Sequence, residues 1–87
     1  MYVMVLILNK DEKVNEEYAF PHDFPEFPQV GDTIELCGAE IDERWFPELK
    51  NYGAKEFFKV VNRGWRIVTD EKVTCPYIVV RNKEYYV

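Results

Sequence analysis

The sequence predicts a mostly-β domain, either a small barrel or a bent antiparallel sheet of five to seven short strands, with at most one short helix near residues 47–52. Two observations support this fold class. Apolar runs of strand length, rich in valine, isoleucine and aromatic residues, recur along the chain. Glycine, proline and asparagine separate these runs at short intervals, which is typical of small β barrels.

The chain length of 87 residues indicates one domain spanning residues 1–87. Hydrophobic residues make up 47% of the chain and aromatic residues 16%, which is enough for a packed core and excludes a disordered chain. The apolar N-terminal run lacks the flanking signals of a secretory leader and is far shorter than a membrane span. We therefore expect a cytoplasmic protein with no membrane partner.

The N-terminal part of the chain predicts a hairpin. Residues 2–8 are apolar throughout, which indicates a strand buried on both faces. Residues 9–12 are polar and turn-like. From Lys13 the apolar residues alternate with polar ones, so residues 13–20 are expected to pair back onto the first strand.

Three phenylalanines in residues 20–28 each precede a proline: Phe20, Phe24 and Phe27. Proline lacks an N–H donor and pushes its predecessor into extended geometry, which excludes a helix or a central strand. We therefore expect an extended loop. Its rings either hold the loop onto the core or form an exposed aromatic segment for a partner.

A tight turn is predicted at residues 30–32. Gly31 tolerates a positive φ, and Asp32 can hydrogen-bond to nearby backbone. The alternation of apolar and polar residues from position 33 then indicates a strand. This Pro-x-x-Gly-Asp pattern over residues 28–36 resembles the segment that leads into a strand in many small SH3-like barrels. The resemblance implies a fold class and no activity.

A short helix and a second hairpin are expected next. Pro47 suits the first turn of a helix over residues 47–52, and Gly53 suits its end. A hairpin is predicted over residues 55–69, with the loop at residues 62–64, because Gly64 can adopt the left-handed geometry of such a loop.

The C-terminal segment predicts a loop and two strands. Residues 70–75 are expected to form a polar loop that Pro76 closes. Residues 77–81 are rich in isoleucine and valine and predict a strand. A two-residue turn then leads to residues 84–87, which are expected to pair back onto that strand.

Charge is distributed unevenly along the chain. Residues 1–50 hold 4 Lys/Arg and 12 Asp/Glu, a net charge of −8, whereas residues 51–87 hold 7 and 4, a net charge of +3, in a chain of net charge −5. Such asymmetry indicates either a charged partner or two halves that pack together and complement each other.

The sequence does not predict an enzyme. His22 is the only histidine, and no signature places it beside Cys37 or Cys75. The four glycines are scattered, so there is no glycine-rich phosphate loop. We therefore expect no catalytic residues, no metal site and no cofactor, since structural zinc needs four closely spaced ligands.

Protein binding is the leading functional prediction. The six phenylalanines, six tyrosines and two tryptophans exceed what a core of this size is expected to hide, and interfaces are enriched in such residues. The predicted contacts are Phe24, Phe27, Trp45, Phe46, Tyr85 and Tyr86.

The acidic first half favours a basic or nucleic-acid-binding protein as the partner. The C-terminal strand could also pair edge to edge with a second copy, which would make the chain a small assembly subunit. The small size, the missing catalytic set and the acidic, aromatic-rich composition are similar to those of accessory proteins of phages and mobile elements. This resemblance implies an inhibitor or a regulator.

Single-stranded nucleic acid or a nucleotide is the alternative ligand. Small barrels bind single strands by stacking bases on exposed rings and neutralising phosphates with basic side chains. The acidic net charge opposes this function, because phosphate contacts dominate such affinity. The predicted contacts are Lys59, Arg63, Trp65, Arg66 and Arg81.

Overall fold

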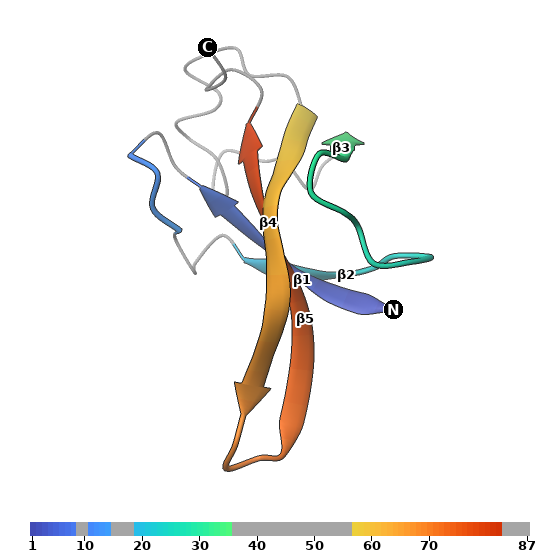
Figure 1. Cartoon of the computed structure of the whole chain (residues 1–87), viewed down its shortest axis with the longest axis vertical. Coiled ribbons are helices and arrows are strands. Elements are labelled where there is room, and N and C mark those ends of the chain that lie inside the picture. The colour runs from blue at the N-terminus through green and yellow to red at the C-terminus, as the bar shows by residue number, and fades with distance from the viewer. Residues whose placement is uncertain (9–10, 15–18, 36–56, 83–87) are drawn as a thin grey trace.

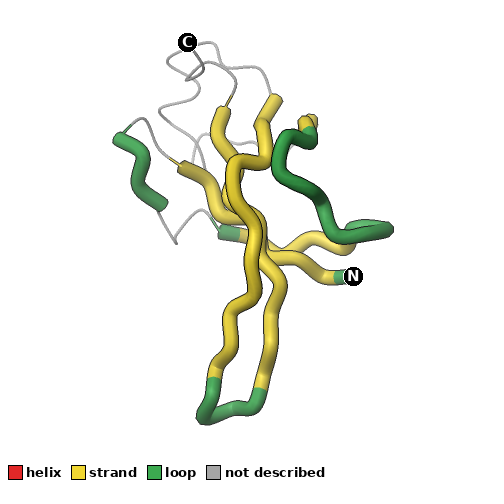
Figure 2. Tube along the Cα trace, in the orientation of Figure 1, coloured by secondary structure: helices red, strands yellow, loops and turns green. Residues whose placement is uncertain are grey.

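The structure is a computed structural model that describes residues 1–8, 11–14, 19–35 and 57–82. The described strands are β1 (Tyr2–Leu8), β2 (Phe20–Asp23), β3 (Thr33–Glu35), β4 (Phe57–Val68) and β5 (Val73–Asn82). They form one sheet in the order β2-β1-β5-β4-β3. β1 and β2 cross the direction of β4 and β5, so the sheet curls into a half-barrel (Figure 1). The described residues contain strands, turns and loops but no helix (Figure 2).

The predicted mostly-β class is confirmed, but the bent antiparallel sheet, which is one of the two predicted architectures, is not what the described strands form. β1 pairs antiparallel with β2 and parallel with β5, from Met4 opposite Tyr77 to Leu8 opposite Arg81. β4 pairs antiparallel with both β5 and β3. The sheet is therefore mixed, and it supports the β class without a specific SH3-like topology. Sequence patterns do not reveal strand direction, because a buried apolar run suits both kinds of ladder.

The core lies on one face of the sheet. The register places Val5 opposite Ile78 on this face and Val60 opposite Val80. The buried core residues are Val3, Val5, Ile7, Phe58, Val60, Ile78 and Val80. Leu6 lies on the opposite face of β1 and is also buried. The prediction that residues 2–8 form a strand buried on both faces is thus confirmed from Val5 onward.

The predicted pairing of residues 13–20 with β1 is observed at both ends of that range and continues beyond it to Asp23, whereas residues 15–18 lie outside the described residues. Val5 lies opposite Phe20 of β2, whereas Val14 forms only an isolated bridge with Leu8. The first four residues of the predicted Phe-Pro loop are therefore a strand. Pro21 is compatible with β2 because β2 is an edge of the described sheet, where a missing N–H leaves no ladder bond unmade.

The predicted loop at residues 62–64 is wrong. β4 runs through this segment, which pairs regularly with β5, and a register shift like that of a β-bulge lies just before it, between Val60 and Asn62. Gly64 lies opposite Tyr77, and a Cβ atom at Gly64 would lie 2.6 Å from the Tyr77 hydroxyl oxygen. The glycine is therefore needed for the close approach of a cross-strand ring rather than for a turn.

The hairpin turn lies at residues 69–72, where Lys72 has a φ of 54°. The predicted polar loop over residues 70–75 is accordingly wrong in its second half, because β5 begins at Val73. Pro76 lies inside β5, opposite Trp65. The predicted helix at residues 47–52 and the predicted strand at residues 84–87 lie outside the described residues.

The predicted turn at residues 30–32 is confirmed. Gly31 has a φ of 99°, and the Asp32 N–H donates to the Gln29 carbonyl oxygen at 3.0 Å. These features are those of a type II turn, in which the third residue needs a positive φ. The Asp32 Oδ2 atom accepts a hydrogen bond from the Gln29 N–H at 2.9 Å and reinforces the turn.

Replacing Gly31 by alanine is expected to lower the free energy of unfolding by about 1 kcal/mol. A Cβ atom at Gly31 would meet no atom within 4 Å, so the loss is conformational and not steric. Urea denaturation measures the effect. Gly31→Asn is the control and should lose less, because asparagine adopts the left-handed region more readily. An equal loss for both variants would contradict this explanation.

Candidate functional site

A two-stranded arm extends from the sheet. We define the arm as residues 62–76, which comprise the second half of β4, the turn and the start of β5; it projects downward in Figure 1. β1 pairs with β5 only from Tyr77 onward, and β3 pairs with β4 only as far as Lys59. A two-stranded ribbon cannot cover its own apolar side chains. Three of them are accordingly exposed: Trp65, Ile67 and Val73.

Trp65 and Ile67 lie on the face of the arm that continues the core. Paired residues of an antiparallel ladder share a face, and Arg63 lies opposite the core residue Ile78. Trp65 and Ile67 follow at successive alternate positions on β4. Trp65 is 56% exposed and Ile67 66% exposed. We call these two residues the arm stripe.

The loop between β2 and β3 places an aromatic ring against the arm stripe. β2 and β3 are opposite edges of the described sheet, so residues 24–32 must cross the core face. The crossing packs Phe24 and Phe27 against the core. The ring of Phe27 also meets Trp65 edge to face, with 5.3 Å between the ring centroids. Such pairs contribute about 0.5–1.5 kcal/mol beyond the burial of their area.

Arg63 also contacts the Phe27 ring. Its guanidinium carbon lies 4.7 Å from the centroid of the Phe27 ring, and its Nη1 atom donates to the Pro28 carbonyl oxygen at 3.3 Å. The cation–π contact and the hydrogen bond hold the loop and the arm together. Phe27, Arg63 and Trp65 form what we call the Phe27 cluster.

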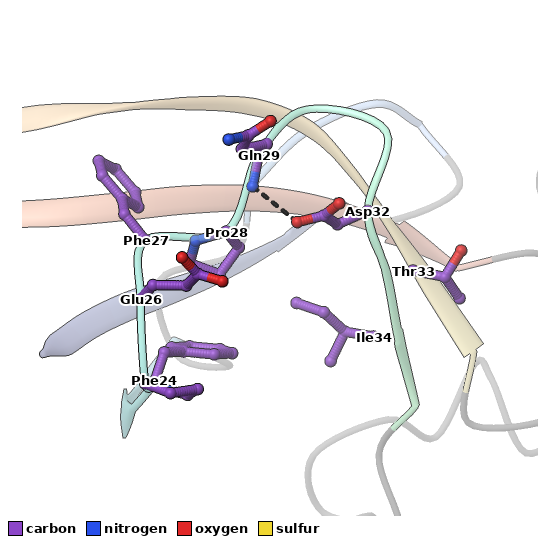
Figure 3. A pocket seen from close by; sticks show the side chains of 9 residues that line it. Phe24, Glu26, Phe27, Pro28, Gln29, Asp32, Thr33 and Ile34 are labelled. Atoms are coloured by element: carbon purple, nitrogen blue, oxygen red, sulfur yellow. Dashed lines mark hydrogen bonds between the residues drawn. The ribbon is translucent and has the colours of Figure 1, made fainter.

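A groove of about 570 Å³ lies beside the Phe27 cluster. Phe24 and Ile34 form an apolar side of the groove, and the Phe27 side chain points away from them (Figure 3). Glu26 and Asp32 add carboxylates, of which Asp32 is engaged in the turn. The lining residues are Phe24, Pro25, Glu26, Phe27, Pro28, Gln29, Asp32, Thr33 and Ile34.

The predicted protein-binding residues fall into two groups. Phe24 and Phe27 are half-buried against the core, so they hold the loop in place; Phe27 also supports Trp65. The other four lie outside the described residues: Trp45, Phe46, Tyr85 and Tyr86.

The structure does not bring the predicted nucleic-acid-binding residues onto one surface. Arg63 and Trp65 share the core face. The register places Lys59, Arg66 and Arg81 on the opposite face of the sheet. Arg81 is half-buried and forms an ion pair with Glu12. A stacking platform surrounded by several basic side chains is therefore not formed by these five residues.

The exposure of Ile67 and Val73 does not follow from the elements that the sequence pattern predicts. The loop predicted at residues 62–64 placed Ile67 on the return strand of a packed hairpin, where it is expected to be covered. The available signal was the polar segment at residues 69–72, which lies between two runs of β-forming residues. A turn at that segment makes both runs the two strands of one arm.

The described residues contain no gathering of three or more His, Cys, Asp or Glu side chains that could hold a metal ion. His22 lies on the core face, opposite Val3, and its ring packs against Phe24. Cys75 is half-buried on the other face, opposite Arg66. His22 and Cys75 are thus on opposite faces of the sheet, and Cys37 lies outside the described residues.

Comparison of the chain with models of protein families, with curated proteins and with solved structures finds no match. Within the described part of the chain, no helix is long and apolar enough to cross a membrane. The arm and the residues around it are therefore the features from which a function can be inferred.

A double-mutant cycle between Phe27→Leu and Trp65→Ala is expected to give a coupling energy of about 0.5–1.5 kcal/mol, because the two rings contact each other. Thermal or urea unfolding of the four proteins measures it. Phe24→Leu is the matched control, because the Phe24 ring packs against His22. Equal coupling of Trp65 to Phe24 and to Phe27 would refute a specific contact.

Proposed function

We propose that the chain is a non-enzymatic protein-binding module that contacts its partner through the arm, with the arm stripe as the centre of the interface. The observation that carries this proposal is the exposure of Trp65 and Ile67 on a ribbon that has no third strand among the described residues. Tryptophan is the residue type most enriched among the contacts that dominate binding energy.

The Phe27 cluster supports this function by restraining Trp65 before any partner arrives. The edge-to-face contact with Phe27 limits the rotamers that the Trp65 side chain adopts. A side chain that is ordered in the free protein loses less conformational entropy on binding, which favours affinity. The 56% of the Trp65 surface that stays exposed is then available as a rigid apolar contact. Occupation of a partner's surface in this way is how an inhibitor or a regulator acts.

Single-stranded nucleic acid is the second proposal. The observation that favours it is that Arg63 and Trp65 are neighbours on one face, which is the combination that binds a stacked base and its phosphate. The expected affinity for a single strand is low. Phosphate contacts supply most of such affinity, and Arg66 lies on the other face of the arm.

Trp65→Ala combined with Ile67→Ala is expected to remove the partner without unfolding the domain, because both side chains are exposed. The measurement is quantitative capture of partners from cells that express the protein, with folding checked by circular dichroism. Tyr2→Ala is the matched control, because Tyr2 is a 70% exposed ring on β1, which is not part of the arm. Capture of the same set of proteins by all variants would refute the proposal.

Titration with labelled single-stranded DNA and RNA at low and high salt separates the two functions. A protein-binding module is expected to show no binding at low salt. Salt-sensitive binding that Arg63→Ala abolishes would instead establish the nucleic-acid function, since binding that neutralises phosphates weakens as salt rises.

A further inference from the structure

Among the described residues, the outer edge of β4 is covered only along its first half. β3 pairs with it over Phe57–Lys59. Val60 is the next covered residue: its carbonyl oxygen accepts from the Gly31 N–H, and its N–H donates to the Asp32 carbonyl oxygen, each at 2.9 Å. The chain then turns away at Gly31. From residue 62 to residue 68, no described residue pairs with this edge.

The register shows which main-chain groups point out of this edge. In an antiparallel ladder, pairs that exchange two hydrogen bonds alternate with pairs that exchange none. Pro76 has no N–H, so its pair with Trp65 is of the second kind. The N–H and C=O groups of Trp65, and by the same alternation those of Ile67, therefore point outward. The outward N–H of Arg63 donates to the Asn62 Oδ1 atom at 2.9 Å.

The two edges of the arm differ in their capacity to accept another strand. On the β5 side, Pro76 offers no N–H donor, which blocks a continuous ladder. On the β4 side, Trp65 and Ile67 offer two donors and two acceptors at the spacing of an extended strand. A partner strand therefore adds to the β4 edge, where its alternate side chains lie beside the arm stripe.

The charge of the residues along the β4 edge indicates which kind of strand can pair with it. The two paired strand segments, residues 63–68 of β4 and residues 73–78 of β5, contain Arg63 and Arg66 and no Asp or Glu, although the whole chain has a net charge of −5. A second copy that paired with this edge would place two further arginines beside Arg63 and Arg66. Like charges on neighbouring strands are destabilising. An acidic strand is complementary instead.

We propose that the outer edge of β4 at residues 63–68 is a strand-addition site for an extended acidic segment of a partner protein. The segment hydrogen-bonds to the Trp65 and Ile67 main chain. Its apolar side chains lie on the side of the arm stripe, and its carboxylates lie on the side of Arg66. This inference rests on the proposed protein-binding function and names the chemistry of the partner.

The test uses the full chain labelled with ¹⁵N and a short synthetic peptide that alternates glutamate with valine. The peptide is expected to shift the amide signals of Trp65 and Ile67 and to slow their hydrogen exchange, with an affinity that falls as salt rises. Two control peptides should not bind: one with lysine in place of glutamate, and one with methyl groups on alternate backbone nitrogens.

Two variants distinguish binding through the Ile67 main chain from binding through the Ile67 side chain. Ile67→Pro removes an outward N–H and leaves the β4–β5 bonds intact, so it should weaken peptide binding by up to about tenfold. Ile67→Thr keeps the N–H and should lose less. The methylated peptide gives the same information on the unaltered protein if the proline variant does not fold.

Unchanged Trp65 and Ile67 amide signals, or equal shifts with the lysine peptide, would overturn the inference. A dimer that sedimentation detects and that Ile67→Pro dissolves would also overturn it, in favour of a second copy. If partner capture still depends on the Trp65 side chain while the amides do not respond, only strand addition fails. If partner capture does not depend on the Trp65 side chain and the amide signals do not respond either, the proposed function fails as well.

Discussion

The parallel ladder between β1 and β5 determines where the core ends and the exposed arm begins. It places an apolar strand between two others, so that Val5 and Ile7 meet Ile78 and Val80 on the core face. The ladder begins only at Tyr77 of β5. Every residue of β5 before that point therefore lacks a second neighbour among the described strands, and β4 loses its outer neighbour after Val60. The same register thus produces both the buried core and the exposed arm.

The loop over residues 24–32, which crosses the core face, connects the buried core with the exposed arm. Because β2 and β3 are opposite edges, the chain between them has to cover the sheet, and its phenylalanines pack onto the core as it does so. Of the described aromatic side chains, only Tyr2 and Trp65 are strongly exposed. The aromatic surplus that the composition indicates is therefore concentrated, within this part of the chain, at a few positions. Trp65 is the one among them that other side chains hold in place.

Fold prediction from the sequence succeeded where a local rule was sufficient. The burial of residues 5–8 on both faces followed from an uninterrupted apolar run, and the turn at Gly31 followed from backbone chemistry. It failed where two local rules competed. Gly64 suits a hairpin loop, but it also suits a strand position that a facing tyrosine ring must approach closely. The site was predicted in pieces for the same reason. Phe27 and Arg63 were assigned to different functions, because 36 positions of sequence separate two side chains that are in contact.

Sequence patterns alone were enough to predict that the domain is mostly β, which residues could be core, and that Trp65 lies between Arg63 and Arg66. These properties are local, since they depend on side-chain type and on a spacing of two residues. The tertiary structure decided strand direction, the extent to which each neighbour covers β4 and β5, and therefore which rings remain exposed. Exposure depends on where a distant strand begins to pair, and the residues of the arm carry no information about that position.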